Sequence, residues 1–121
     1  MKRTELRVDN IVAYKGLAYK VIGISTTHIL LMVDEIETIL VDVENLEPVP
    51  ITEELLTKCG FDEPCDGVYE HGFGKFEVTK EGDEWWVSWH GGCDYWFAIK
   101  YLHQLQNAYQ LVTKEELTLQ L

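Results

Sequence analysis

The side chains in this sequence best suited to binding a metal ion are its three cysteines and two of its four histidines. They are Cys59, Cys65, His71, His90 and Cys93. Zinc prefers thiolate and imidazole ligands, and structural zinc sites usually contain two close pairs of the Cys-x2-Cys kind. Only His90 and Cys93 approach that spacing. We therefore expect no bound metal and no other cofactor, and if a metal is bound these residues are its candidate ligands.

Cys93 is also the candidate nucleophile of a Cys/His pair, with His90 or His71 as its base. Such a site needs the base within hydrogen-bond reach of the thiol and a third group that orients the base. The sequence offers no evident orienting residue, and the negative charge of the adjacent Asp94 disfavours the reactive thiolate.

The paired carboxylates fall at predicted turns and helix starts, and the glycines form no phosphate-binding motif. We therefore predict that the chain is not an enzyme.

Aromatic residues are concentrated between positions 85 and 97. Large aromatic side chains either fill cores or anchor protein interfaces. Successive residues of a strand point to opposite faces of a sheet, which divides this set in two. The predicted core members are Trp85, Trp89 and Phe97. Trp86 and Trp96 are expected near the surface, where exposure among acidic residues marks a protein interface or a dimer contact.

The segment 101–112 has apolar residues at helical spacing, which predicts a helix that covers the second sheet. Its polar residues are expected to face water; they are His103, Gln104, Gln106, Asn107 and Gln110. His103 and Asn107 lie one turn apart and are the residues of this face best placed to bond to each other or to cap a strand edge. With Trp86 and Trp96 they complete the set of candidate binding residues.

These residues depend on elements that the hydrophobic pattern predicts. Short β-forming runs predict strands at 10–14, 17–24, 29–33 and 38–41, followed by a turn and an edge strand that ends at Pro50. Four strands in so short a stretch indicate a small, strongly curled sheet, and their order resembles SH3-like small barrels. Residues 1–50 are therefore expected to form an SH3-like β subdomain.

Residues 51–121 are expected to form a second subdomain. Thr52 as N-cap and Gly60 as stop predict a short linking helix. After a loop at 62–67, β-forming runs predict a strand at 68–71, a hairpin of 75–80 with 84–89, and a short strand at 95–97 before the C-terminal helix. Because the connector contains two prolines and no Gly/Ser spacer, both subdomains are expected to pack as one α+β unit.

The composition is that of a folded acidic domain, with 46% hydrophobic and 12% aromatic residues and a formal charge of -11 over 121 residues. Both halves carry excess acid, which disfavours direct binding to nucleic acid or to anionic membranes. No apolar leader opens the chain, and the longest apolar run, Ile29 to Val33, is too short for a membrane span. An odd number of cysteines indicates a reducing, cytoplasmic setting. The expected partner is a protein, a second copy of the chain included.

Four segments of the chain carry a family resemblance: residues 50–56 and 58–61, the stretch Ile-Lys-Tyr-Leu-His-Gln-Leu-Gln-Asn at 99–107, and residues 115–119. They resemble a family of small uncharacterised bacterial and bacteriophage proteins. The resemblance covers nearly the whole chain and supplies no site residues. It implies an origin in a phage or mobile element, which favours interaction or regulatory roles over metabolism.

Together these observations favour a non-enzymatic protein-interaction or regulatory module. One alternative is a small zinc-binding protein or enzyme that uses the Cys/His set. Another is an acidic mimic that occupies a nucleic-acid-binding protein, for which binding should weaken steeply with salt.

Overall fold

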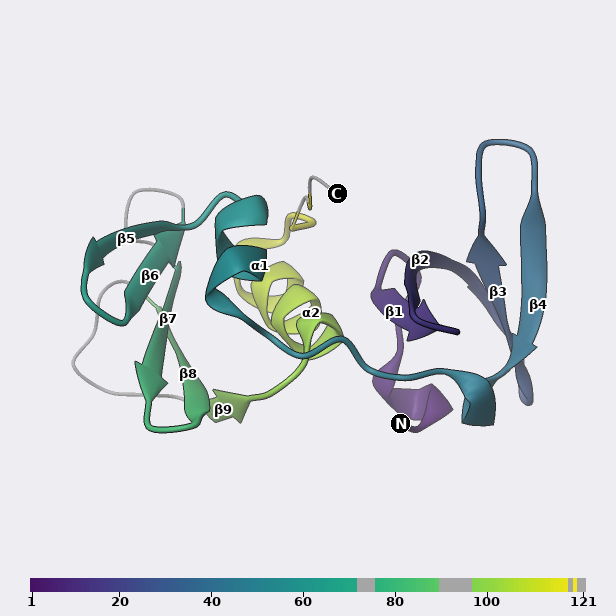
Figure 1. Ribbon diagram of the computed structural model, residues 1–121, viewed down its shortest axis with the longest axis horizontal. Coiled ribbons are helices and arrows are strands. Elements are labelled where there is room, and N and C mark those ends of the chain that lie inside the picture. The colour runs from purple at the N-terminus through teal and green to yellow at the C-terminus, as the bar shows by residue number, and fades with distance from the viewer. Residues whose placement is uncertain (72–75, 90–96, 118, 120–121) are drawn as a thin grey trace. The chain divides into compact units, whose positions relative to one another are not determined.

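The chain divides into two compact units, each with its own antiparallel sheet (Figure 1). The computed structural model describes residues 1–71, 76–89, 97–117 and 119. Unit 1 comprises Met1–Pro50 and Tyr101–Asn107, and unit 2 comprises Ile51–Lys100 and Ala108–Leu121. Two antiparallel sheets with helices confirm the predicted α+β class.

Unit 1 contains a four-stranded sheet in the order β1-β2-β3-β4. Its elements are a 3-10 turn (Arg3–Glu5), β1 (Ile11–Tyr14), β2 (Leu17–Ile24), β3 (His28–Met32), β4 (Thr38–Asp42) and a second 3-10 turn (Val43–Asn45). The β1–β2 turn places Lys15 and Gly16 at φ 51° and 81°. Two positive φ values are the signature of the type I′ turns that favour tight hairpins, so the predicted hairpin is confirmed.

The core of unit 1 lies on one face of this sheet. Its buried residues are Leu6, Val12, Val21, Ile29, Leu31, Val41 and Leu46. Ile29 pairs with Val41 across β3 and β4, and the intervening pair Leu30 and Leu40 points to the opposite face. This alternation leaves the second face of the β3–β4 hairpin outside the core.

The four-stranded sheet of unit 1 is open and does not close into a barrel of the SH3-like kind that the strand order resembles. The predicted edge strand that ends at Pro50 is reduced to isolated bridges: Ala13 and Glu47 exchange two backbone hydrogen bonds of 2.8 Å, and Pro50 forms a bridge with Tyr101. Pro48 and Pro50 have no N–H to donate, so the pairing does not extend into a ladder.

Unit 2 contains a five-stranded sheet in the order β5-β6-β7-β8-β9. Its elements are α1 (Glu53–Lys58), β5 (Asp62–Cys65), β6 (Val68–His71), β7 (Phe76–Glu81), β8 (Glu84–Trp89) and β9 (Phe97–Ile99). The helix α2 (Leu102–Thr113) follows, and its residues up to Asn107 group with unit 1.

Local signals position α1 as the sequence predicts. The Thr52 hydroxyl accepts a 3.1 Å hydrogen bond from the backbone N–H of Leu55, which caps the first turn. Gly60 ends the helix at φ 89°, a conformation that residues with a Cβ rarely adopt.

The predicted loop after α1 is wrong. The acidic, proline-containing segment 62–65 is the strand β5 and not a loop, since Asp62 pairs with Glu70 and Cys65 with Val68. The last strand, β9, is described over Phe97–Ile99, and positions 95 and 96 of the predicted strand lie outside the described residues.

The core of unit 2 lies on the face of the sheet that carries Trp85 and Val87. Both are buried, as are Phe61, Tyr69, Phe76, Val78, Ile99 and Tyr109. The prediction for Trp85 is confirmed, whereas Phe97, expected in the core, lies at the edge of the sheet and is exposed. The side chain of Trp89 lies outside the described part of the structure.

Candidate interaction surface

Part of the predicted water-facing side of α2 is buried in unit 1. The prediction is wrong for His103, which is fully buried, and for Gln106, which is also buried. Gln106 Oε1 accepts a 2.8 Å hydrogen bond from the N–H of Ile11, and its Nε2 donates to the carbonyl of Asp9 at 3.1 Å. These bonds satisfy backbone groups at the start of β1.

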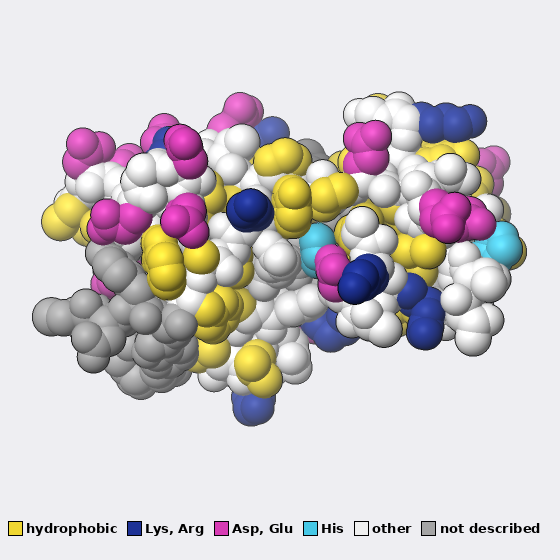
Figure 2. All heavy atoms as spheres, turned by 90° about the horizontal axis from the view of Figure 1, so that it is seen from below, with side chains coloured by type: hydrophobic (Ala, Val, Ile, Leu, Met, Phe, Trp, Pro, Cys, Tyr) yellow, Lys and Arg dark blue, Asp and Glu magenta, His cyan; other side chains and the backbone are white. Residues whose placement is uncertain are grey.

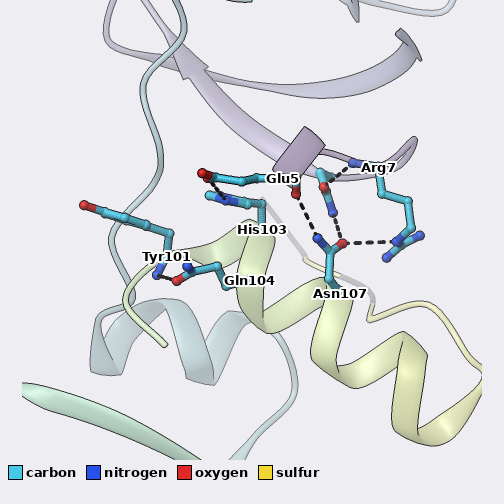
Figure 3. A network of polar contacts seen from close by, with 7 residues as sticks. Glu5, Arg7, Tyr101, His103, Gln104 and Asn107 are labelled. Atoms are coloured by element: carbon cyan, nitrogen blue, oxygen red, sulfur yellow. Dashed lines mark hydrogen bonds and ion pairs between the residues drawn. The ribbon is translucent and has the colours of Figure 1, made fainter. Parts of the chain in front are cut away.

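Asn107 connects α2 to the segment before β1 (Figure 3). Its Oδ1 accepts hydrogen bonds from Nδ2 of Asn10 at 2.8 Å and from Nε of Arg7 at 3.1 Å. Its Nδ2 donates to the Glu5 carbonyl at 3.1 Å. Both polar atoms of this amide are engaged within unit 1, which makes Asn107 a structural residue and not an exposed contact.

His103 points toward Glu5 and stacks on Tyr101 (Figure 3). Its Nε2 lies 3.6 Å from Oε2 of Glu5, beyond hydrogen-bond distance but within the range of an ion pair. Burial lowers the pKa of His103, and the Glu5 carboxylate opposes that shift. The ring is therefore held mainly in the neutral form, and it does not bond to Asn107.

Trp86 is half-buried on the face of the unit 2 sheet opposite the core. The register places it beside Thr79 and Ala98, and Glu77 pairs with Ser88 on the same face. Ser88 and Thr79 are themselves buried, so this face is not open around Trp86. Trp96 lies outside the described residues.

The Cys/His set is only partly visible, because His90 and Cys93 lie outside the described residues. Cys59 is buried and Cys65 is exposed, and both are free thiols. Nδ1 of His71 is hydrogen-bonded to the Tyr109 hydroxyl at 3.1 Å. In the described part of the chain, no group of three or more His, Cys, Asp or Glu side chains is arranged to hold a metal ion.

A cavity of about 440 Å³ lies beside α1 and the β7–β8 hairpin in unit 2. Its lining residues are Ile51, Thr52, Glu53, Glu54, Lys80, Asp83 and Trp85. Acidic side chains around an indole ring are suited to a cationic group. The ammonium of Lys80 already lies 5.5 Å from the centre of the Trp85 ring, so this chain fills that position itself.

The connection between β3 and β4 is an acidic turn held by side-chain hydrogen bonds. Oδ1 of Asp34 accepts backbone hydrogen bonds from Ile36 at 2.8 Å and from Glu37 at 2.7 Å. Both hydrogen bonds lower the pKa of Asp34, and the bond from Glu37 has the larger effect. The carboxylate therefore stays ionised and continues to accept the hydrogen bonds that hold the turn.

This turn presents an apolar side chain to solvent. Ile36 is 92% exposed, and Leu40, on the outward face of β4, is 65% exposed. Met32 and Val33 are also exposed at the same end of the hairpin. We call these four residues, with Asp34, Glu35 and Glu37 between them, the hairpin surface. On the face that Figure 2 shows, acidic side chains lie beside hydrophobic ones in both units.

The hairpin surface lies in a stretch without basic residues. Between Lys20 and Lys58 the sequence contains no Lys or Arg, whereas residues 34–47 contain six Asp or Glu. Lys20, which pairs with Met32 across the sheet, is already bound to Asp9 at 3.2 Å. The surface thus combines exposed apolar side chains with negative charge.

Comparisons with family models, curated proteins and solved structures found no match. Among the described residues, no helix has the length and apolar character needed to cross a membrane. The hairpin surface is therefore assigned on its geometry and chemistry alone.

Sequence reasoning missed the hairpin surface, although one signal for it was present. Ile36 stands alone among acidic residues in the turn between two strands, where a polar residue is the usual choice. An apolar residue at that position has no core to enter, so its side chain is expected at the surface.

Proposed function

We propose that this protein is a non-enzymatic interaction module, of phage or mobile-element origin, that binds a basic protein through the hairpin surface. The observation that carries the proposal is the 92% exposure of Ile36 on a turn that Asp34 braces. Exposed apolar side chains with a polar rim are typical of protein interaction sites. A braced turn also costs little conformational entropy when it binds.

The charge of the surface specifies the partner. Acidic side chains surround the apolar centre, and the whole chain carries a formal charge of -11. A second copy would meet like charge, whereas a basic protein would be attracted from a distance and held by complementary contacts. The same charge disfavours direct binding to nucleic acid.

The proposed setting is the cytoplasm. Cys59 and Cys65 are both unbridged, which suits a reducing compartment.

A matched pair of substitutions tests the function. Leu40 and Leu111 are both 65% exposed, but only Leu40 belongs to the hairpin surface. The tagged chain is used to recover partners from a host lysate, and the dissociation constant of each purified partner is then measured. We expect Leu40→Ser to weaken binding about tenfold or more, since a buried leucine contributes about 1.5–3 kcal/mol. Leu111→Ser is expected to bind like the wild type.

Equal affinities of the wild type and Leu40→Ser would contradict the proposal, as would a partner without a basic surface. The dependence of affinity on salt distinguishes the interaction module from an acidic mimic of nucleic acid. An acidic mimic of nucleic acid binds through charge alone, so its affinity falls steeply as salt rises, whereas an interface with an apolar centre and a charged rim loses less affinity.

A further inference from the structure

The ends of the β3–β4 ladder establish its hydrogen-bonding pattern. The N–H of Val33 donates to the carbonyl of Glu37 at 2.9 Å, and the N–H of Val43 donates to the carbonyl of Thr27 at 3.4 Å. In an antiparallel pair, residues that bond to the partner strand alternate with residues whose N–H and C=O point away from it. The bonds at both ends therefore show that the N–H and C=O groups of the odd-numbered residues of β4 point toward β3.

The same alternation identifies the backbone groups at the outer edge of β4. Ile39 and Val41 bond to β3, while the N–H and C=O groups of Thr38, Leu40 and Asp42 point outward. In the described part of the chain β4 pairs only with β3 and lies at the end of the strand order (Figure 1). A row of backbone donors and acceptors therefore lies along the strand that carries Leu40.

β4 lacks the features by which proteins usually protect an edge strand, namely proline, lysine, a bulge or a short length. The other edges in the described structure have such features. Glu47 pairs with β1, Pro64 interrupts β5, and β9 is only three residues long. The segment Thr38–Asp42 is instead a regular run of β-forming residues, which suits it to pair with another strand.

Charge at both ends of β4 specifies the strand that fits. Glu35 and Glu37 precede the strand, and Asp42 and Glu44 lie at its end, with apolar residues between. A complementary segment has apolar, β-forming residues at its centre and lysine or arginine at each end. If β4 of a second copy paired with this edge, the acidic residues of the two strands would lie close together and repel each other.

We propose that β4 binds its partner by strand addition: an extended, basic-ended segment of another protein pairs with the outward backbone groups of Thr38, Leu40 and Asp42. In this mode the main chain supplies affinity and the flanking charges supply specificity. The proposal rests on the function proposed above and names how that surface recognises its partner.

Hydrogen exchange on the full-length protein tests the pairing. The probe is the capped peptide Lys-Lys-Val-Thr-Val-Thr-Val-Lys-Lys at about millimolar concentration, the range in which weak peptide binding is measured. In the free protein, the amides of Ile39 and Val41 should exchange slowly and those of Thr38, Leu40 and Asp42 rapidly. With the peptide, the latter three should become protected by about tenfold or more.

Two matched peptides serve as controls. One has the same side chains but is N-methylated throughout its central Val-Thr-Val-Thr-Val stretch, so it cannot donate to a strand edge. The other has glutamate in place of lysine. Both are expected to bind at least about tenfold more weakly, since one loses the backbone bonds and the other meets like charge.

Each contrary outcome overturns the inference. No protection by the lysine peptide, or equal binding of the N-methylated peptide, would exclude strand addition at β4. Equal binding of the glutamate peptide would exclude a basic partner, and dimers of the free protein that protect the same amides would make a second copy the occupant. The interaction module itself is tested by the effect of Leu40→Ser on the affinity for the recovered partner and by the charge of that partner, so the two proposals are tested separately.

Discussion

The backbone N–H of Ile11 donates a 2.8 Å hydrogen bond to Oε1 of Gln106, a residue 95 positions later in the chain. The same amide donates through Nε2 to the carbonyl of Asp9. One side chain of α2 thus satisfies a donor and an acceptor at the entrance to β1, and both bonds lie within unit 1.

Replacing Gln106 should therefore destabilise unit 1. In Gln106→Leu the N–H of Ile11 and the carbonyl of Asp9 lose their partners, and an unsatisfied buried group costs about 1–3 kcal/mol. We expect a loss of that size in the free energy of unfolding, measured by circular dichroism in urea. Gln110→Leu, on the same helix but half-exposed, is the control and should change stability little. Equal losses for both variants would contradict the assigned role.

His103 should make stability depend on pH. Burial lowers its pKa below the ordinary value of 6.5, against the opposing effects of Glu5, so the unfolded chain binds the proton more readily than the folded chain. Stability is then full above about pH 6.5 and falls as the pH drops toward the lowered native value. The free energy of unfolding is measured between about pH 7.5 and pH 5.5, where most carboxylates remain ionised.

The control for this prediction is His103→Gln, which cannot titrate. The wild type should lose more stability than the variant over that interval, whatever the absolute stability of each. Parallel curves would show that His103 keeps its ordinary proton affinity in the folded protein.

The two described cysteines should differ in reactivity. Burial raises the pKa of Cys59 to about 11 and encloses the thiol, whereas Cys65 is exposed. Because the thiolate is the reactive form, iodoacetamide at neutral pH should alkylate Cys65 at least about tenfold faster than Cys59. Peptide mass spectrometry reports both rates, and denaturant should abolish the difference. Rapid labelling of Cys59 in the native protein would show that α1 opens readily.

The cap of α1 should contribute measurably to unit 2. Thr52→Ala removes the acceptor for the N–H of Leu55 and should cost about 1 kcal/mol, whereas Thr52→Ser keeps the hydroxyl and most of the stability. All four tryptophans belong to unit 2, so their fluorescence in urea follows this unit. A cost for Thr52→Ser equal to that for Thr52→Ala would contradict the capping role.

The sequence by itself determined the features that depend on near neighbours. Lys15-Gly16 specified the first hairpin, Thr52 and Gly60 the bounds of α1, and the alternation around Trp85 the buried face of β8. Turn geometry, capping and strand periodicity act over a few residues, so they can be read from a short stretch of sequence.

Tertiary structure decided the rest, because it depends on residues distant in the chain. The spacing of Gln106 and Asn107 predicts that both face water. In the structure both side chains instead form hydrogen bonds to residues 5–11, which are about a hundred positions earlier in the chain. The segment 62–65 is a strand only because β6 pairs with it. The position of β4 at the edge of its sheet likewise follows from the order in which the strands pair, and that order cannot be predicted from the local sequence pattern.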